Sequence, residues 1–261
     1  MRSLDIAGTG MQAQQINVEV ISNNIANMTT TGFKRRRAEF QDLIYQNLRR
    51  VGSNSSDTGT IVPAGAQVGL GVRTAAIYRI SEQGTLQQTS NSLDVAIRGN
   101  GFFQVTLPTG EIAYTRDGTF GLSPDGVIVT ADGYPVAPGI TVPPNAQDIT
   151  IDASGQVQAK LSGQTATQLV GTMQLAVFPN EAGLDAQGGN LLLQSAASGN
   201  PVIGPPSAPG FGSVMQGFVE GSNVNVVSEI TNLITAQRAY EMNSKVITTA
   251  DQMLSTLTNL R

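Results

Sequence analysis

The sequence contains no cysteine, no histidine and no tryptophan. Without cysteine the chain can form no disulfide or thiolate metal site, and it has no thiol nucleophile. Without histidine it lacks the commonest general base and metal ligand, so a serine–histidine–aspartate triad cannot be built. We therefore expect no catalytic residue, no metal site and no cofactor.

Charge is also scarce, because only 13% of the 261 residues are charged and the net charge is −4. This balance excludes a nucleic-acid binder that relies on overall basicity. No apolar run reaches the length of about 18 residues that a membrane span needs, so we expect no membrane insertion. Residues 1–30 lack the continuous apolar stretch of a signal peptide, and none is expected.

Proline and glycine are confined to the middle of the chain. All 12 prolines lie within residues 63–209, and of the 29 glycines only Gly8 and Gly10 lie outside residues 32–221. Both residue types mark turns and weaken helices. The two ends are therefore free to be helical, and the middle is rich in turns.

This division predicts an α+β fold. Long N- and C-terminal helices would pair as a coiled-coil-like core domain, with a central all-β domain inserted between them. The expected parts are an N-terminal helix, an extended connector, the β domain and a C-terminal helix, over residues 1–33, 34–71, 72–221 and 222–261.

Apolar residues near the N-terminus recur at alternating intervals of three and four, which places them along one side of a helix. We call this set the N-terminal seam, and it consists of Leu4, Met11, Val18, Ile21 and Ile25. Gln14 is a polar exception within the same spacing. The run from Thr29 to Gly32 provides the expected stop.

The C-terminal segment has the same spacing over roughly four heptads, which is enough to predict coiled-coil packing. Its residues, the C-terminal seam, are Leu233, Tyr240, Asn243, Ile247, Leu254 and Leu257. A polar residue within a seam can fix the register of the pairing, and Asn243 is a candidate for this role. The alternative is a partly exposed position without such a role.

Two helices that share one seam leave further apolar residues on their second faces. These residues are Ile16, Val20, Ile230, Ile234 and Val246. Many copies arranged around an axis would cover them, and a contact that does not close on itself builds a filament or tube. We expect such an assembly through the two seams, and the alternative is a two-helix stalk packed on its own β domain.

The middle of the chain reads as β structure. Residues 101–136 alternate short apolar strands with the turn signals Pro108–Gly110, Asp117–Gly118, Pro124–Gly126 and Asp132–Gly133. Residues 179–212 are expected to form long loops. The stretch over residues 46–71 is expected to be extended, to contact neighbouring subunits lengthwise and to stiffen an assembly.

Two local patterns leave alternatives open. Gly99 and Gly101 form a G-x-G that is a weak nucleotide signature, and a tight turn is the preferred interpretation. The basic run Lys34–Arg37 is compatible with nucleic-acid binding or a nuclear signal. The acidic remainder of the chain does not support that interpretation. Two others are preferred equally, namely a solvated helical start in which Arg35 pairs with Glu39, and a contact of the run with acidic groups of a neighbouring subunit.

Three long stretches resemble the bacterial flagellar rod and hook proteins. Ile21–Lys34 resembles their N-terminal motif, and Glu220–Val226 with Ala236–Lys245 and Thr249–Leu254 resembles their C-terminal motif. Between these, Leu93–Val105 and Tyr114–Phe120 are similar to the central β domain of that family. Met28–Thr31 departs from the family, which often has an Asn-Thr pair there.

The resemblance implies a structural subunit that self-assembles into a rigid hollow tube and transmits motor torque to the hook. The length and the connector are most similar to distal rod subunits, and the alternatives are a proximal rod protein or a short hook protein. The implied partners are further copies in a helical homo-oligomer, proximal rod proteins, hook or hook-junction proteins, the surrounding rings and the flagellar export apparatus. The implied location is the rod of the basal body in the periplasm, reached without a cleaved signal peptide.

Two other classes of protein remain as alternatives. A secreted glycan hydrolase would need two carboxylates facing each other across a cleft, whereas Asp117, Asp125 and Asp132 lie in turn tripeptides. A surface adhesin with a coiled-coil stalk would form a soluble trimer instead of a tube.

Overall fold

The computed structural model describes residues 2–49, 65–163 and 166–259, with the side chains of residues 257–259 excepted. The chain forms two compact units. The first, which we call the helical unit, comprises residues 1–25, 36–78 and 225–261. The second, the β-rich unit, comprises residues 26–35 and 79–224.

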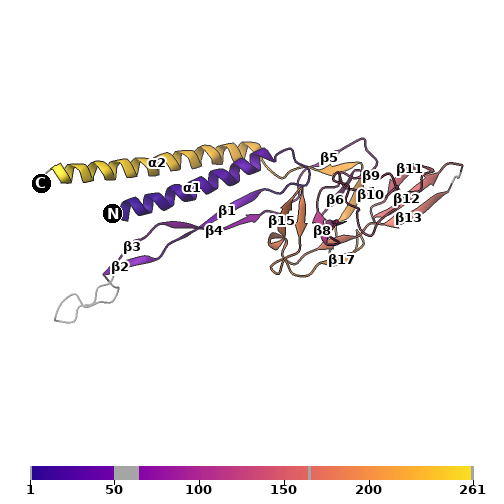
Figure 1. The fold of residues 1–261 in the computed structure, drawn as a ribbon, viewed down its shortest axis with the longest axis horizontal. Coiled ribbons are helices and arrows are strands. Elements are labelled where there is room, and N and C mark those ends of the chain that lie inside the picture. The colour runs from indigo at the N-terminus through magenta and orange to yellow at the C-terminus, as the bar shows by residue number, and fades with distance from the viewer. Residues whose placement is uncertain (1, 50–64, 164–165, 260–261) are drawn as a thin grey trace. The chain divides into compact units, whose positions relative to one another are not determined.

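The helical unit contains both long helices together with four strands (Figure 1). Helix α1 spans Arg2–Ala26 and helix α2 spans Val226–Asn259. Two antiparallel pairs accompany them, in which β1 pairs with β4 and β2 pairs with β3. These strands span Arg36–Asp42 (β1), Tyr45–Arg49 (β2), Ala66–Gly69 (β3) and Val72–Arg79 (β4).

Asn24, near the end of α1, connects that helix to both β1 and α2. Its Nδ2 donates to the Arg36 carbonyl and its Oδ1 accepts from the Arg36 amide, both at 2.8 Å. The side-chain amide thus forms the two hydrogen bonds to Arg36 that a backbone group of a neighbouring strand would form. The same Nδ2 donates to Glu229 Oε2 at 3.2 Å. Asn24 and Glu229 are both buried, so this clamp satisfies polar groups that water does not reach.

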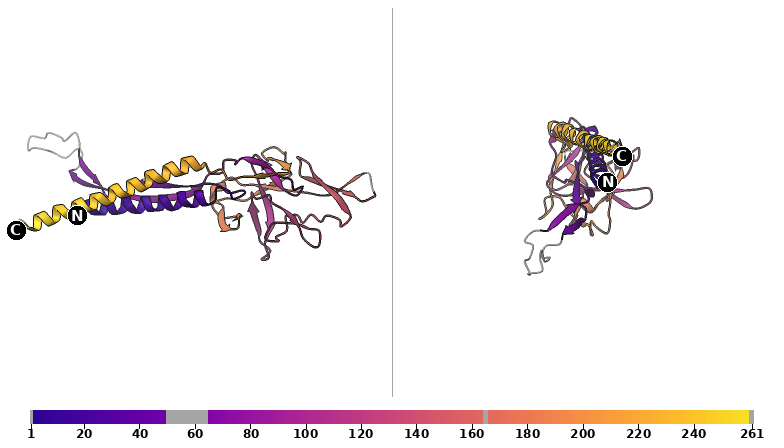
Figure 2. Two further views of the ribbon diagram at one scale, coloured as in Figure 1. Left: turned by 90° about the horizontal axis from the view of Figure 1, so that it is seen from above. Right: turned by 90° about the vertical axis from the view of Figure 1, so that its left-hand side faces the viewer.

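The described residues of the β-rich unit form fifteen strands and one short 3₁₀ helix, η1 (Glu181–Gly183). Its largest sheet has six strands in the order β15-β16-β8-β7-β14-β17, and a second sheet has the order β11-β12-β13. Figure 2 gives two further views of these elements. The strands of these two sheets span Phe102–Thr106 (β7), Ile112–Thr115 (β8), Ala146–Ile151 (β11), Gln156–Leu161 (β12), Thr167–Thr172 (β13), Leu175–Val177 (β14), Asp185–Gly188 (β15), Leu191–Leu193 (β16) and Val202–Gly204 (β17).

The remaining strands form two-stranded pairs, which are β5 with β19, β6 with β18, and β9 with β10. They bring the C-terminal part of the unit back onto its beginning, because β18 and β19 pair with strands more than a hundred residues earlier in the chain. Their bounds are Leu86–Gln88 (β5), Val95–Arg98 (β6), Gly121–Leu122 (β9), Ile128–Val129 (β10), Ser213–Gln216 (β18) and Phe218–Glu220 (β19).

The hairpin signals predict most of the local turns correctly. Pro108–Gly110 joins β7 to β8, and Pro124–Gly126 joins β9 to β10. Asp117–Gly118 does not close a hairpin. A Cβ on Gly118 would collide with the Val95 carbonyl, so glycine is needed there for close backbone approach. The loop expected over residues 179–212 is wrong in part, because it contains η1, β15, β16 and β17.

The fold class expected from the sequence is wrong. The β region is not one domain inserted into a coiled-coil core of paired helices, because strands run from Arg36 to Glu220 and β1–β4 belong to the helical unit. The ribbon of β1 and β4 contacts α1 at two places along the helix. At one, the Arg36 amide donates to Asn24 Oδ1, and at the other the Val72 amide donates to Thr9 Oγ1 at 3.3 Å. Helix α1 therefore packs against strands as well as against α2, and its periodicity alone does not reveal that second contact.

The core of the β-rich unit is apolar and centres on Phe103, which is fully buried and meets Phe120 edge to face at 5.0 Å between ring centroids. Glycine and short turns let many short strands contribute to this one core. Its other large members are Val95, Ile97, Ile128, Val136, Val157, Met173, Leu175 and Val214.

We expect Phe103→Ala to lower the free energy of unfolding of the β-rich unit by about 3–5 kcal/mol, because it removes a buried ring and leaves a cavity. The measurement is denaturant unfolding of the full chain, followed by NMR through the buried methyl group of Met173. Leu169→Ala is the matched control, because Leu169 is exposed and its truncation should change the stability by less than about 0.5 kcal/mol. Equal effects of the two changes would contradict the assignment of the core.

Asn24→Ala should destabilise the helical unit by about 1–3 kcal/mol, because it removes the hydrogen-bond partner of the Arg36 backbone groups and of the buried Glu229 carboxylate. The readouts are loss of helical circular dichroism in denaturant and faster hydrogen exchange at the Arg36 amide. Gln12→Ala changes an exposed residue of the same helix and should have little effect. If both variants unfold at the same denaturant concentration as the parent, the clamp contributes nothing.

Candidate assembly surface

The N-terminal seam is only partly buried in the helical unit. Ile21 is buried, whereas Leu4, Met11, Val18 and Ile25 are half-buried. The buried face of α1 lies roughly a quarter turn around the helix from this seam, and its other members are Ala7, Ala13, Val20 and Asn24. The ribbon of β1 and β4 meets α1 on a different side from the seam, at Thr9 and Asn24. Most of the larger seam residues are thereby left near the surface.

The C-terminal seam is more open still. Leu233, Asn243 and Ile247 are half-buried, Tyr240 is 44% exposed, and Leu254 also lies in the exposed class. The two buried apolar residues of α2 are Ala236 and Ala250 among its described side chains. Leu257 lies outside the described side chains.

An open groove lies where the two seams meet. Val18 on α1 and Tyr240 on α2 line a groove of about 540 Å³, together with Gln15, Glu19, Gln237 and Glu241. The two apolar residues are therefore neighbours, but they do not close the space between their helices. Such a groove has room for a side chain from outside the chain.

Asn243 packs against the backbone of α1. A Cβ added to Gly10 would lie 2.9 Å from Asn243 Nδ2, which is too close for an ordinary contact. Glycine at position 10 thus gives Asn243 its place over α1. A role of Asn243 in fixing the register of the helices stays a prediction.

Outside the C-terminal seam, six of the described large apolar side chains of α2 lie exposed in the single chain. Val227 is 75% exposed, and the others are Ile230, Ile234, Met242, Val246 and Met253. We call these six residues the outer face of α2. Of the second-face residues expected from the sequence, Ile230, Ile234 and Val246 are exposed, Ile16 is half-buried and Val20 is buried. In the same unit, Ile44 in the link between β1 and β2 is 81% exposed, and Leu48 of β2 is exposed as well.

The basic run Lys34–Arg37 is not the start of a helix, because β1 begins at Arg36. Lys34 is buried in the β-rich unit, where its Nζ contacts Glu220 Oε1 and donates to the Glu82 carbonyl. Burial lowers the pKa of Lys34, and the Glu220 carboxylate acts in the opposite direction. Lys34 is therefore an internal structural cation, while Arg36 and Arg37 remain exposed.

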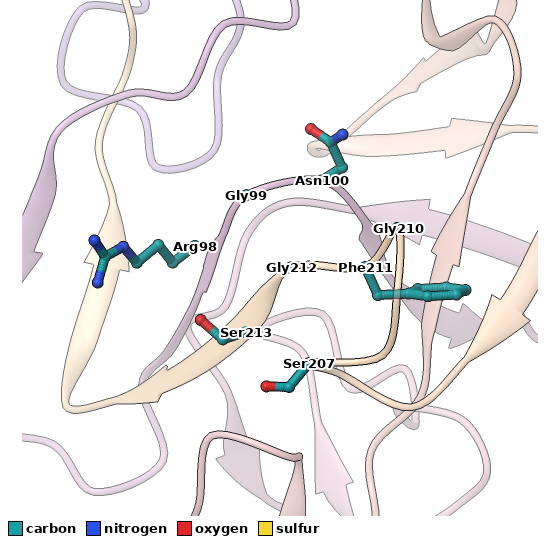
Figure 3. A pocket seen from close by; sticks show the side chains of 8 residues that line it. All are labelled: Arg98, Gly99, Asn100, Ser207, Gly210, Phe211, Gly212 and Ser213. Carbon is teal, nitrogen blue, oxygen red and sulfur yellow. The ribbon is translucent and has the colours of Figure 1, made fainter.

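The G-x-G at Gly99 and Gly101 forms the turn between β6 and β7, as preferred from the sequence, and both glycines have positive φ. Gly99 and Asn100 line an open hollow of about 540 Å³ together with Arg98, Ser207, Gly210, Phe211, Gly212 and Ser213. Figure 3 shows that the side chains of Arg98 and Asn100 point away from each other. The hollow therefore lacks the convergent polar groups of a chemical site.

Within the described part of the chain, no cluster of three or more acidic residues is suited to hold a metal ion. Across the same residues, no helix is both long and apolar enough to cross a membrane. What the described structure offers instead is the apolar groove and the outer face of α2.

Asn24, which joins α1 to β1 and α2, is not among the residues predicted from the sequence. The available signal is a run of polar residues in the last turns of a helix that is otherwise expected to pack. Asn23, Asn24 and Asn27 follow one another closely there, and asparagine readily hydrogen-bonds to nearby backbone.

Comparisons with known proteins agree along the length of the chain. Residues 4–34 match the model described as flagella basal body rod protein. Residues 96–159 match the flagellar hook protein FlgE/F/G D1 domain, and residues 215–260 match the C-terminal model of the flagellar basal body rod FlgEFG proteins.

Several full-length relatives carry the name flagellar basal-body rod protein FlgG. The relative from Caulobacter vibrioides is 60% identical over 261 residues, covering 100% of both chains. That from Agrobacterium fabrum is 55% identical and covers 98% of this chain and 97% of its own. That from Bacillus subtilis is 38% identical, covering 100% and 99%. The chain belongs to the flagellar basal-body rod protein family, most like its distal rod members, and is a structural subunit of the rod.

Proposed function

We propose that copies of this chain polymerise through their helical units into a straight, hollow tube that transmits torque to the hook. The observation that carries this proposal is the outer face of α2, on which six large apolar side chains stand in water in the single chain. Burying such surface is the main favourable term in protein association. The contact between copies is heterologous, so it continues along an axis instead of closing.

The two seams take part in the same contacts. Leu4, Met11, Val18 and Ile25 are half-buried, and Tyr240 lies at an open groove, so each has surface left for a neighbouring copy. Residues 46–71 add lengthwise contacts that stiffen the tube. Of these, residues 50–64 lie outside the described residues, and the exposed side chains of β2 support the proposal.

The partners that we propose are those of a rod subunit. They are proximal rod proteins, hook or hook-junction proteins, the surrounding rings and the export apparatus. We place the assembled tube in the periplasm, and the chain reaches it without a cleaved signal peptide. A purely structural role, without enzymatic activity, is supported by the absence of histidine and cysteine from the sequence.

The direct experiment is electron microscopy of the purified chain at high concentration. Straight hollow fibres are the expected result. A discrete soluble trimer would contradict the proposal and favour the adhesin alternative.

Ile234→Asp should abolish polymerisation or raise the critical concentration by roughly tenfold or more, because it places a charge in a contact that is apolar in the assembly. The measurement is sedimentation of polymer across a concentration series. Asn232→Asp is the matched control, since it adds the same charge at an exposed position of the same helix that lies about 160° around it from Ile234. If Ile234→Asp polymerises as well as Asn232→Asp, the outer face of α2 is not an interface.

Leu254→Asp tests the C-terminal seam separately. We expect this variant to remain monomeric while the β-rich unit stays folded, because Leu254 lies near the end of α2 and outside the core of that unit. NMR of the Met173 methyl group reports the fold, and sedimentation reports assembly. Gln252→Asp, which changes an exposed residue of the same turn, should polymerise normally. Normal polymerisation of Leu254→Asp would remove this seam from the proposal.

A further inference from the structure

The two segments that lead into the long helices lie together in the β-rich unit. Residues 26–35 follow α1, and residues 220–224 precede α2. The Gly32 amide donates to the Glu220 carbonyl at 2.8 Å, and the Arg35 amide donates to Asn223 Oδ1 at 2.7 Å. Segments almost two hundred residues apart in the chain are thus joined by direct hydrogen bonds.

A third segment, residues 80–85, is bound to both of them. Asn223 Nδ2 donates to the carbonyls of Ile80 and Glu82, each at 3.0 Å. The Ile80 amide donates to the Arg35 carbonyl at 2.9 Å. The Gly221 amide donates to the Thr85 carbonyl at 2.8 Å. Asn223 therefore uses its whole side-chain amide to hold three chain segments in one place.

A buried ion cluster lies beneath these hydrogen bonds. Lys34 and Glu220 form an ion pair whose side chains are 5% and 0% exposed. Glu220 Oε1 also accepts from the Gly84 amide at 2.9 Å. Arg116 NH1 lies 3.7 Å from Glu220 Oε2, and its NH2 donates to the Gly99 carbonyl at 2.7 Å. The carboxylate is therefore held from the N-terminal segment and from the β-rich unit together.

Neither segment can leave this cluster without cost. If residues 26–35 detach, Glu220 loses Lys34, and a buried charge without its partner is strongly unfavourable. Gly32 adds a steric condition, since it has φ of +67° and a Cβ there would lie 2.8 Å from the Asp117 amide nitrogen. The segment is thus seated directly on the backbone of the β-rich unit.

We propose that Gly32, Lys34, Arg116, Glu220 and Asn223 form a registration lock, which holds the two helix-bearing segments side by side within the β-rich unit of a single chain. The lock is complete before any contact between copies, because all of its residues belong to that unit. It therefore fixes where α1 ends relative to where α2 begins, independently of how the helices pack in an assembly.

The test measures the separation of the two segments in the free full-length chain. Spin labels on Thr29→Cys and Ser222→Cys report it by pulsed electron paramagnetic resonance, and the absence of native cysteine makes the labelling specific. We expect one narrow distance distribution. Lys34→Met should widen the distribution by roughly twofold or more, because the segment regains backbone freedom. Lys160→Met removes an exposed lysine of the same unit and should leave the distribution narrow.

Asn223→Ala provides a second variant that removes no charge, and it decides the matter if Lys34→Met fails to fold. The Met173 methyl signal shows whether the β-rich unit is folded in each variant. Broadening in a folded variant supports the lock. A broad distribution in the parent, or a narrow one in every folded variant, would overturn it.

Discussion

Apolar surface that a single chain cannot cover is the constraint on which this structure depends. Each square ångström of such surface left in water costs about 25 cal/mol relative to its burial. The β-rich unit encloses a core of its own around Phe103, while some of its apolar side chains, such as Leu169 and Val202, stay exposed. In the helical unit, by contrast, Val227 and Ile44 are 75% and 81% exposed. Most of the large apolar side chains that are exposed among the described residues therefore belong to the helical unit.

The periodicity of the chain ends predicts where helices form but not which side of each helix is buried. The spacing places Leu4, Met11 and Val18 along one side of α1, where all three are half-buried. The ribbon of β1 and β4 meets the helix on a different side, at Thr9 and Asn24. A sequence window around α1 holds no information about strands that pair with one another across thirty residues of intervening chain. The burial of this seam was thus beyond prediction from local pattern.

Polar contacts at long range were equally hidden. Lys34 belongs to a run of four basic residues, and such runs are ordinarily solvated. Its burial depends on Glu220, which is 186 residues away. Short strands such as β16 and β17 were missed for a related reason. The glycine and proline around them signal turns, and the intervening two or three apolar residues are too few to show a period. The hairpins, in contrast, carry their signal in adjacent residues and were predictable.

The small residues on the buried face of α1 have a mechanical consequence. Alanine and glycine lose little side-chain entropy on burial but also contribute little apolar area, so the contacts at Ala7, Gly10 and Ala13 are individually weak. The Asn24 clamp, with its three hydrogen bonds, lies at the opposite end of the helix. Thermal opening of α1 should consequently begin at Leu4 and progress toward Asn24, so proteases would trim this helix from its tip before they reach its base.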